Sequence, residues 1–417
     1  MSETIAADVC VMGAGPVGGT LACRLAAAGV ATAVVDRAAL PPMEHPRFDG
    51  RAYAIAAGSR PVLEAAGLWD RLPFAPNPIL DIRVSDARLG RSPSRLFLHF
   101  AHHEAKPGAG PFGWMVEARS LRMALNTRMR EMPALRVFSP AAAVAERRED
   151  GVTVRVAGGP EIRCRLVVAA EGRDSPLREA AGIAVTRFPY RQSSIICAVS
   201  HDKPHHDVAL ENFLPTGPFA ALPMGPSVDA QPGGARHVSA IVWTEDSEVA
   251  EQVLQFDDAR LAREIVRRLG DHLGAVRIIG HRWRYPLSAM LAHDYTARRL
   301  ALAGDAAHGI HPVAGQGLNL GFRDAIALSD LVIEAVEAGA DPGGAQLLAR
   351  YQQRRRGDNL LMLVITDGLD RLFSNDVRLL RLARDGGIAT VGRMRGLKRA
   401  FMRRAMGQHL GDSGSPV

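Results

Sequence analysis

A short segment near the N-terminus restricts the fold of this chain more than any other part of the sequence. An apolar run at residues 8–12 is typical of a buried strand, and the turn Gly-Ala-Gly-Pro-Val-Gly follows it at residues 13–18. We expect an alanine-rich helix over residues 17–28 and a second strand over residues 31–35. Strand, glycine turn, helix and strand in this order form a βαβ unit, so the sequence predicts an α/β fold with a parallel sheet.

The glycine turn has the G-x-G-x-x-G spacing of a dinucleotide-binding site. Gly13, Gly15 and Gly18 would allow a tight turn and close approach of a pyrophosphate, whose charge the helix N-terminus stabilises. Asp36 lies 18 positions after Gly18, where its carboxylate can accept hydrogen bonds from ribose hydroxyls. This motif predicts a dinucleotide but leaves open the choice between a nicotinamide and a flavin.

Two later motifs favour a flavin. Each follows a short apolar strand: EGRDS at residues 171–175, and a glycine-rich crossing at residues 304–324. Asp305 can offer a fixed carboxylate to hydroxyls, and Gly315 and Gly317 let the backbone approach a flat ligand. The N–H groups that begin the next helix favour negative charge. A sugar-alcohol chain that ends in a ring made anionic by reduction fits these features, and a flavin has that structure.

The remaining sequence predicts a second domain inserted into the first. Residues 193–200, 217–223 and 237–244 look like strands, and with residues 82–100 they are assigned to a mixed sheet that a helix over residues 257–273 should cover. The expected architecture is an α/β fold with a Rossmann-like FAD-binding domain, an inserted mixed β-sheet substrate domain and a helical C-terminal region. The FAD-binding domain takes residues 1–78, 112–185 and 284–345, the substrate domain 79–111 and 186–283, and the helical region 346–417.

The composition indicates the class of protein and its expected cellular location. Of its 417 residues 47% are hydrophobic and 23% charged, which is ordinary for a globular protein. No apolar run is long enough for a transmembrane helix and the N-terminus does not resemble a signal peptide, so we expect a cytoplasmic location, with a peripheral position at the inner membrane surface as an option. The four cysteines show no ligand spacing, and no metal site is expected.

The positive charge is the compositional feature that bears on partners. A net charge of +7 admits nucleic acid, an anionic membrane surface or acidic ligands. Because no basic patch is interleaved with aromatic residues, nucleic acid is not expected. On a helix over residues 392–404, Met394, Leu397, Phe401 and Met402 would fall roughly on one side among basic residues. This pattern fits a membrane-surface helix or a terminal helix docked on its own domain.

The motifs together resemble those of the flavoprotein aromatic hydroxylases, the single-component group that includes p-hydroxybenzoate hydroxylase. GAGPVG at 13–18, AEGRDS at 170–175 and GDAAH at 304–308 match the three motifs of the group. HPVAGQGLNLGFRD at 311–324 is typical of its branch of ubiquinone-biosynthesis ring hydroxylases. The resemblance continues to TDGL at 366–369 and so runs nearly end to end. One departure is Glu171, where the group usually has aspartate.

The resemblance implies a role for each matched residue. Gly13, Gly15 and Gly18 would contact the FAD pyrophosphate, Asp36 the adenosine ribose and Asp305 the ribityl chain. Other residues expected at the cofactor are Arg51, Arg119, Glu171 and Gly172, and those expected along the isoalloxazine ring are Pro312, Gly315, Gly317, Leu318 and Asn319. His308 and His311 lie beside this loop by motif, and a role in supporting its backbone is favoured over acid/base catalysis. No catalytic base can be named.

The implied reaction hydroxylates an aromatic ring. NAD(P)H would act as a transient co-substrate that reduces the flavin, and O2 would form a flavin hydroperoxide that transfers its distal oxygen to a polyprenylated phenol or quinone precursor. The implied partners are a membrane surface or a ubiquinone-biosynthesis complex. The residues expected in the substrate wall are Phe213, Gly217, Pro218, Phe219, Leu222 and Pro223, although core packing explains each of them equally well.

Three other functions stay open on the same fold. The chain could hydroxylate a soluble aromatic, reduce an isoprenoid with its flavin, or serve as a non-enzymatic flavin-bound subunit of a hydroxylase complex.

Overall fold

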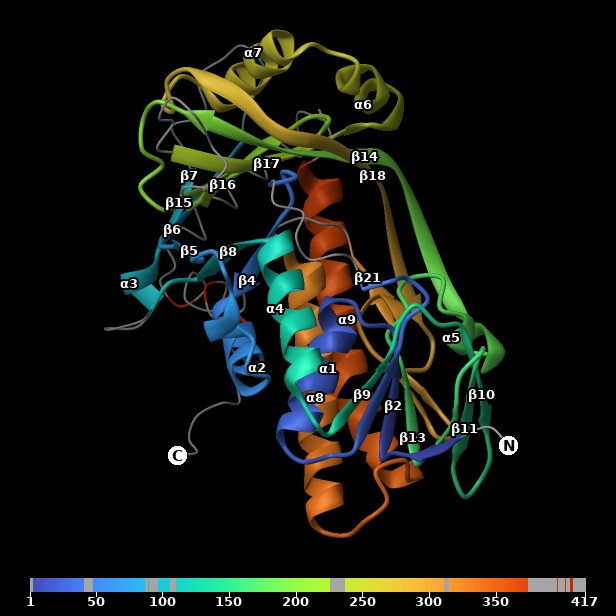
Figure 1. Ribbon diagram of the computed structural model, residues 1–417. Helices are drawn as coiled ribbons and strands as arrows, with labels where there is room; N and C mark the ends of the chain where they lie inside the picture. The colour runs from blue at the N-terminus through green and yellow to red at the C-terminus, as the bar shows by residue number, and fades with distance from the viewer. Residues whose placement is uncertain are drawn as a thin grey trace.

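The computed structural model describes residues 3–40, 48–86, 89, 97–105, 110–225, 237–310, 315–373, 396, 402 and 406–407. A parallel sheet flanked by helices occupies one end of the molecule, and a large mixed sheet with its own two helices occupies the other (Figure 1). The arrangement confirms the predicted α/β fold with an inserted sheet domain and a helical region after it.

The parallel sheet has six strands in the order β19-β20-β13-β2-β3-β9. They are β2 (Val9–Met12), β3 (Thr32–Val35), β9 (Leu135–Phe138), β13 (Leu166–Ala169), β20 (Leu300–Leu302) and the antiparallel edge strand β19 (Thr296–Ala297). β2, β3, β13 and β20 are buried along their whole length, which explains their uninterrupted apolar sequences.

Layers of structure cover both faces of this sheet. On one face α1 (Pro16–Ala27) packs between α4 (Ala118–Glu131) and α8 (Gln316–Glu337), and α9 (Ala345–Phe373) packs on α8. On the other face lies a four-stranded sheet of β1 (Thr4–Ala6), β12 (Glu161–Cys164), β11 (Val152–Val156) and β10 (Ala143–Arg147) (Figure 1). In the described part of the chain, no helix is long and apolar enough to cross a membrane.

The mixed sheet has eight strands in the order β21-β18-β14-β17-β16-β15-β6-β7. They are β6 (Asp81–Asp86), β7 (Phe97–Ala101), β14 (Val185–His201), β15 (Val208–Leu214), β16 (Gly217–Met224), β17 (His237–Asp246), β18 (Val276–Ala292) and β21 (His308–Gly309). Helices α6 (Ser247–Leu254) and α7 (Asp258–Leu269) cover its outer face around Phe219, Trp243 and Ile265. β6 and β7 come from the segment at residues 82–100 that was assigned to this sheet, and residues 87–88 and 90–96 between them lie outside the described residues.

A small three-stranded sheet connects the two ends of the molecule. It consists of β4 (Ala52–Ala56), β8 (Gly113–Glu117) and β5 (Asn77–Ile79). Short helical segments complete the described chain: η1 (Ala57–Ser59), α2 (Arg60–Ala65), η2 (Trp69–Arg71), α3 (His102–Ala105), α5 (Pro176–Ala180) and η3 (Gly304–Ala306).

Part of the C-terminal tail docks on this small sheet. Met402 and Met406 are 1% and 3% exposed and pack in one apolar cluster with Met115 of β8 and Ala240 of β17. The backbone N–H of Gly58 donates to Met406 O at 2.7 Å. Of the apolar tail residues considered for a membrane-surface helix, Met402 is therefore covered by the protein itself, and Met394, Leu397 and Phe401 lie outside the described residues.

Two long strands run between the domains, and one of them crosses a predicted domain boundary. β14 and β18 are each 17 residues long, and the boundaries expected at 185/186 and 283/284 fall at the start of one and inside the other. Their pairing shifts register between Pro189 and Ser193 and between Ile196 and Ala198. Such irregularities bend a strand without ending it, so the same two strands leave the cofactor region and enter the mixed sheet.

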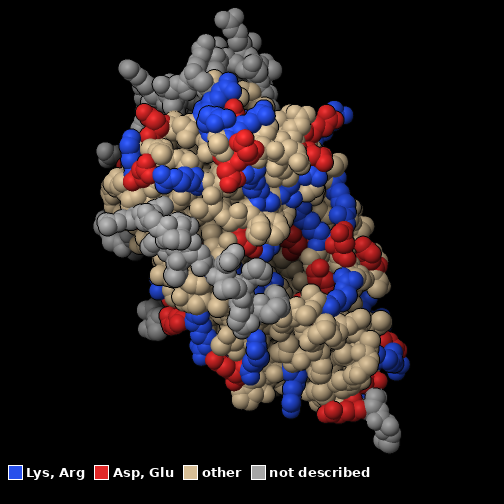
Figure 2. Space-filling model, turned by 45° about the horizontal axis from the view of Figure 1, so that its top comes forward, with Lys and Arg blue, Asp and Glu red and all other residues tan. Residues whose placement is uncertain are grey.

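Charged side chains of both signs share the surface. On the face that Figure 2 shows, lysine and arginine gather near the top of the view with aspartate and glutamate among them. The net charge of +7 is therefore not displayed on this face as a patch of one sign.

Candidate functional site

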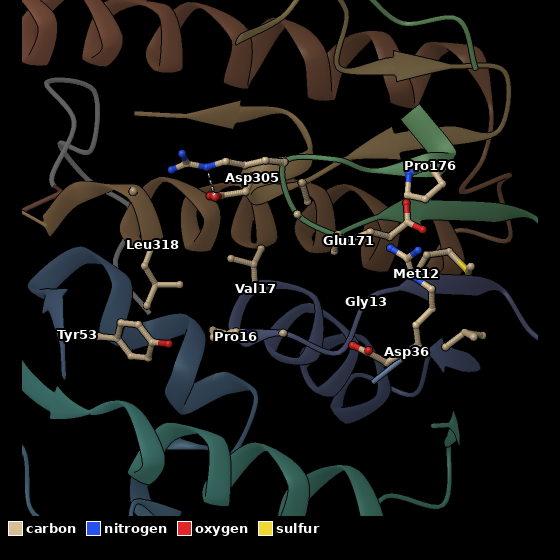
Figure 3. A pocket seen from close by; sticks show the side chains of 18 of the residues that line it. Met12, Gly13, Pro16, Val17, Asp36, Tyr53, Glu171, Pro176, Asp305 and Leu318 are labelled. Carbon is tan, nitrogen blue, oxygen red and sulfur yellow. Dashed lines mark hydrogen bonds and ion pairs between the residues drawn. The ribbon is translucent and has the colours of Figure 1, made fainter. Parts of the chain in front are cut away.

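A cleft of about 820 Å³ lies at the carboxyl ends of the parallel strands. In such folds this is the edge at which ligands bind, because the strand-to-helix turns meet there. Figure 3 shows Asp36 toward one end, Tyr53 and Leu318 toward the other, and Asp305 in between. The predicted cofactor residues that line the cleft are Gly13, Gly15, Asp36, Glu171, Gly172, Asp305, Gly315, Gly317 and Leu318.

Four predicted residues do not line it. Gly18, Arg51, Arg119 and Asn319 are absent from its walls, and Pro312 lies outside the described residues together with His311.

The three glycines of the first turn have two different functions. A Cβ on Gly13 would lie 2.3 Å from Ala170 O, and one on Gly18 would lie 2.1 Å from Gly13 O. These two glycines therefore let the turn and α1 pack against the end of β13. A Cβ on Gly15 would meet no protein atom within 4 Å, so Gly15 alone of the three leaves open space toward the cleft.

Two helices begin at this cleft with a glycine at the N-cap, and within the described residues neither has a side-chain cap. The first turns of α1 and α8 contain no acidic residue, and neither Gly15 nor Gly315, their N-cap residues, has a side chain to accept hydrogen bonds. Gly315 takes the left-handed conformation, with φ +61°, which glycine adopts without strain. Uncapped N–H groups at two helix N-termini favour negative charge at two places along the cleft.

The peptide of Ala14 is fixed from both sides. Its N–H donates to Asp36 Oδ2 at 2.6 Å, and its carbonyl accepts from Arg122 Nη1 at 2.9 Å. Asp36 Oδ1 also accepts from Ala38 N at 2.8 Å. The carboxylate is thus held in one orientation at the end of the cleft where the ribose was expected.

Arg122 was missed in the sequence, which pointed to Arg119 one helical turn earlier. Arg119 Nε donates instead to Glu117 Oε2 at 2.6 Å, and its guanidinium lies 4.2 Å from the centroid of the Phe74 ring. The contact between α4 and the glycine turn therefore belongs to Arg122.

Asp305 is both fixed and accessible. Its Oδ2 accepts from Arg173 Nε at 3.0 Å, and Arg173 Nη1 donates to Ser288 Oγ at 2.9 Å. The Asp305 side chain is 46% exposed, and within the described residues its Oδ1 has no hydrogen-bond partner. One carboxylate oxygen is thus held by the protein and the other is available to a hydroxyl in the cleft. Arg173 is part of the EGRDS motif, but its contact with Asp305 was not predicted from the sequence.

The Glu171 side chain is long enough to reach the N-terminus of α5. Its Oε2 accepts from Ser175 Oγ at 2.6 Å and from Leu177 N at 3.2 Å. The departure from aspartate therefore places the carboxylate at the N-terminus of a helix, where its charge is favoured.

Tyr53 and Asn319 occupy the other end of the site. Tyr53 lines the cleft, and burial raises the pKa of its hydroxyl, which therefore remains a neutral donor. Asn319 is 1% exposed and points inward: Oδ1 accepts from Ala56 N at 2.8 Å, and Nδ2 donates to Ala54 O at 2.9 Å. Asn319 ties α8 to β4 and supports the cleft from behind.

Arg51 connects the cofactor region to the mixed sheet. Its Nε and Nη2 donate to Asp49 Oδ2 at 2.9 and 2.6 Å, and its guanidinium lies 4.4 Å from the centroid of the Trp283 ring on β18. Trp283 Nε1 in turn donates to Asp49 O at 2.8 Å. The charge of Arg51 is therefore already paired at the junction between the two ends of the molecule.

The predicted substrate wall divides between two faces of β16. Phe219 is fully buried against Trp243, at 6.0 Å between ring centroids, in the cluster beneath α6 and α7. Because side chains alternate along a strand, Pro223 shares that outer face, and neither residue belongs to a wall facing the cofactor region. Gly217 contributes no side chain. Leu222 lies on the inner face with Ala240, and Pro218 pairs with Phe213 on β15.

Comparisons with known proteins agree with this geometry. The family model described as "FAD binding domain" matches residues 6–358. Ubiquinone hydroxylase UbiL of Rhodospirillum rubrum is 48% identical over 402 residues, which cover 96% of this chain and 90% of the relative. The 3-demethoxyubiquinol 3-hydroxylase of Escherichia coli is 32% identical, with 96% and 98% covered.

Solved structures show the same fold. The p-nitrophenol 4-monooxygenase PnpA of Pseudomonas putida superposes with a TM-score of 0.75 at 20% identity, covering 98% of this chain and 99% of that one. Family match, curated relatives and cleft geometry all agree with the resemblance noted in the sequence. The chain belongs to the FAD-dependent aromatic hydroxylases, in the branch that contains the ubiquinone hydroxylases.

Proposed function

We propose that this protein hydroxylates the aromatic ring of a polyprenylated phenol in ubiquinone biosynthesis, with NAD(P)H and O2 as co-substrates. The observation that carries the proposal is the 48% identity to a ubiquinone hydroxylase along 96% of the chain, with the residues of the FAD cleft in place. The cleft ends at Tyr53 and Leu318, next to the small sheet that packs on the inner face of the mixed sheet.

The residues of the cleft fit FAD along its length. The uncapped N-terminus of α1 and the open space at Gly15 would receive the pyrophosphate, and Asp36 would accept hydrogen bonds from the adenosine ribose. Asp305 Oδ1 would accept one from the ribityl chain. The N-terminus of α8 would stabilise negative charge on the ring system after reduction. When bound, FAD supplies the electron transfer from NAD(P)H and the activation of O2.

The chain itself supplies orientation and exclusion of water. Ala52 and Ala54 line the cleft and also pack in the apolar cluster that includes Leu222 and Ala240 of the mixed sheet. An aromatic substrate that meets the flavin at this end would contact apolar side chains and the Tyr53 hydroxyl. Such a dry setting protects a reactive oxygen species from water and side reactions.

The test is the fate of the quinone pool and of molecular oxygen. Deletion of the gene should lead to accumulation of a ubiquinone precursor that lacks one ring oxygen, identified by mass spectrometry. The purified holoprotein, supplied with that precursor, NAD(P)H and 18O2, should return a product heavier by one 18O atom. An unaltered quinone pool together with no labelled product would refute the proposal.

The same assay distinguishes the alternatives. A hydroxylase of soluble aromatics would accept the phenol head group without its prenyl tail, and an isoprenoid reductase would form product without O2. A non-enzymatic subunit would retain FAD but consume no NAD(P)H with any precursor.

Membrane association through the tail is a separate part of the proposal. Because Met402 and Met406 pack on the protein, we propose that any membrane contact uses the other tail residues. Truncation after residue 390 should then reduce both binding to anionic vesicles and thermal stability. If vesicle binding is unchanged, the tail has no membrane role.

A further inference from the structure

A buried polar network lies behind the loop of residues 304–308, on the side away from the cleft. Its centre is Asp324 of α8, which is fully buried. Asp324 Oδ2 accepts from Gly304 N at 2.9 Å and from His308 Nε2 at 2.5 Å, the tautomer that a carboxylate partner imposes on a histidine. One carboxylate oxygen therefore holds both ends of the turn that carries Asp305.

The other oxygen is held from α9. Arg355, whose side chain is 4% exposed, donates from Nε to Asp324 Oδ1 at 2.7 Å. Its Nη1 donates to Asp358 Oδ2 at 2.8 Å and its Nη2 to Asn359 Oδ1 at 2.8 Å. Arg355, Asp358 and Asn359 are three and four positions apart, so they share one face of α9, the face toward α8.

The aromatic residues around the network seal it from water. The Tyr295 ring stacks on His308 at 6.2 Å between centroids, and its hydroxyl accepts from Asn359 Nδ2 at 3.1 Å. Tyr351 of α9 is fully buried, and its hydroxyl donates to Leu302 O at the end of β20. Charges in such a dry environment act on one another more strongly than they would at the surface.

The charges of this network come from α8, from α9 and from His308 of β21. Burial alone raises the pKa of Asp324, but His308 and Arg355 together lower it to about 2, so the carboxylate is ionised at neutral pH. Asp324 is the last residue of the motif at residues 311–324, whereas its guanidinium partner, Arg355, lies on α9. The loop that carries Asp305 thus rests on a buried ion pair, of which α9 supplies the positive member.

We propose that Asp324 and Arg355 form a positioning ion pair that fixes the 304–308 loop and sets the electrostatic environment in which the flavin is reduced. Reduction adds negative charge on the cleft side of this loop. Loss of the Arg355 charge would leave the Asp324 carboxylate with His308 as its remaining partner, and the more negative network would disfavour that charge. Loss of the Asp324 charge would leave Arg355 paired with Asp358, and the more positive network would favour it. The two members of the pair therefore influence the flavin in opposite directions, although both hold the same loop.

Because the two residues should shift the flavin potential in opposite directions, the potentials of their variants test the proposal. The midpoint potential of the bound flavin is measured by dye-coupled reductive titration of the holoprotein at pH 8, far above the pKa of about 2 that Asp324 has beside His308 and Arg355. Arg355→Met should lower the potential and Asp324→Asn should raise it, each by roughly a tenfold change in the reduction equilibrium, about 30 mV for a two-electron couple. A network that only supports the loop would shift both potentials in the same direction or leave both unchanged, and either result overturns the proposal.

Two further variants separate charge from packing. Arg354→Met removes the same charge from an exposed position on the same helix, and it should leave the potential unchanged. Arg355→Lys keeps the charge but loses the forked contacts, so its potential should stay near that of the wild type while its melting temperature falls. If Arg354→Met lowers the potential as much as Arg355→Met, or Arg355→Lys behaves like Arg355→Met, the buried pair does not set the potential.

Discussion

The glycine turn permits a prediction in which two neighbouring substitutions separate folding from cofactor binding. At Gly18 an added Cβ would lie 2.1 Å from Gly13 O and 2.9 Å from Ala170 Cβ, and both contacts are too short for the backbone to tolerate. Helix α1 would have to move, and overpacking of this kind costs about 3 kcal/mol, the upper end of its usual range. Gly18→Ala should therefore destabilise the apoprotein and weaken FAD binding as a consequence.

Gly15→Ala should have the opposite profile. Gly15 has φ −65° and ψ 180°, which alanine adopts freely, and its Cβ would meet no protein atom within 4 Å. The stability of the apoprotein should change by less than about 1 kcal/mol, because the weaker N-cap preference of alanine is offset by the lower conformational freedom of the unfolded chain. The new methyl group would occupy the space we assign to the pyrophosphate, so the FAD dissociation constant should rise by about tenfold or more, equivalent to about 1.4 kcal/mol.

The assay is urea unfolding of each apoprotein together with titration of FAD by flavin fluorescence. Gly357→Ala serves as the control, since Gly357 lies in α9 with no protein atom within 4 Å of its Cβ, away from the cleft. It should gain up to about 1 kcal/mol in stability from helix propensity and bind FAD normally. Normal FAD affinity in Gly15→Ala would refute the placement of the phosphates, and a wild-type unfolding curve for Gly18→Ala would refute the packing of the turn.

Other predictions concern the ribityl contact, acid stability and thiol reactivity. Asp305→Ala should weaken FAD binding about tenfold or more, the value of a hydrogen bond to a charged group, with melting temperature nearly unchanged because the side chain is 46% exposed. Burial, against a backbone hydrogen bond to Lys203, lowers the pKa of His201 to about 4. The unfolded chain takes up this proton near pH 6.5, so the stability tied to neutral His201 is complete above pH 6.5 and lost as the pH falls toward 4. Urea midpoints at pH 7.5 and 5 should differ less in His201→Asn than in the wild type. Burial raises the pKa of the Cys23 and Cys197 thiols to about 12, so a thiol reagent at pH 8 should label neither before urea is added.

Much of the cofactor site was predictable because its parts are local in sequence. A strand, a glycine turn and a helix place Gly15 and Asp36 near one another in any chain that folds this way, and the same holds for Gly304 and Asp305 after β20. Their chemistry follows from residue type and position on the turn. The residues that complete the site are distant partners: Arg122 reaches Ala14 across 108 positions, and Arg173 reaches Asp305 across 132. No spacing rule along the chain pairs them.

The predicted substrate wall also depended on contacts between segments that are distant in the sequence. The alternation of side chains already placed Phe219 and Leu222 on opposite faces of one strand. Which face would be covered by α6 and α7 depended on how those helices dock, and both faces of this strand are apolar. In the structure Phe219 lies on the outer face beneath α6 and α7, and Leu222 lies on the inner face.

The sequence by itself therefore determined the fold class, the flavin and the branch of the family, and it predicted an order of contacts along the cofactor. These properties depend on short segments whose backbone geometry is set by glycines and neighbouring strands. The tertiary structure alone decided which charges meet: Arg122 at the glycine turn, Arg173 at Asp305, and Arg355 of the C-terminal helix at Asp324. The physical reason is that a buried charge needs a partner at hydrogen-bond distance, and only the packing of distant helices brings the partner there.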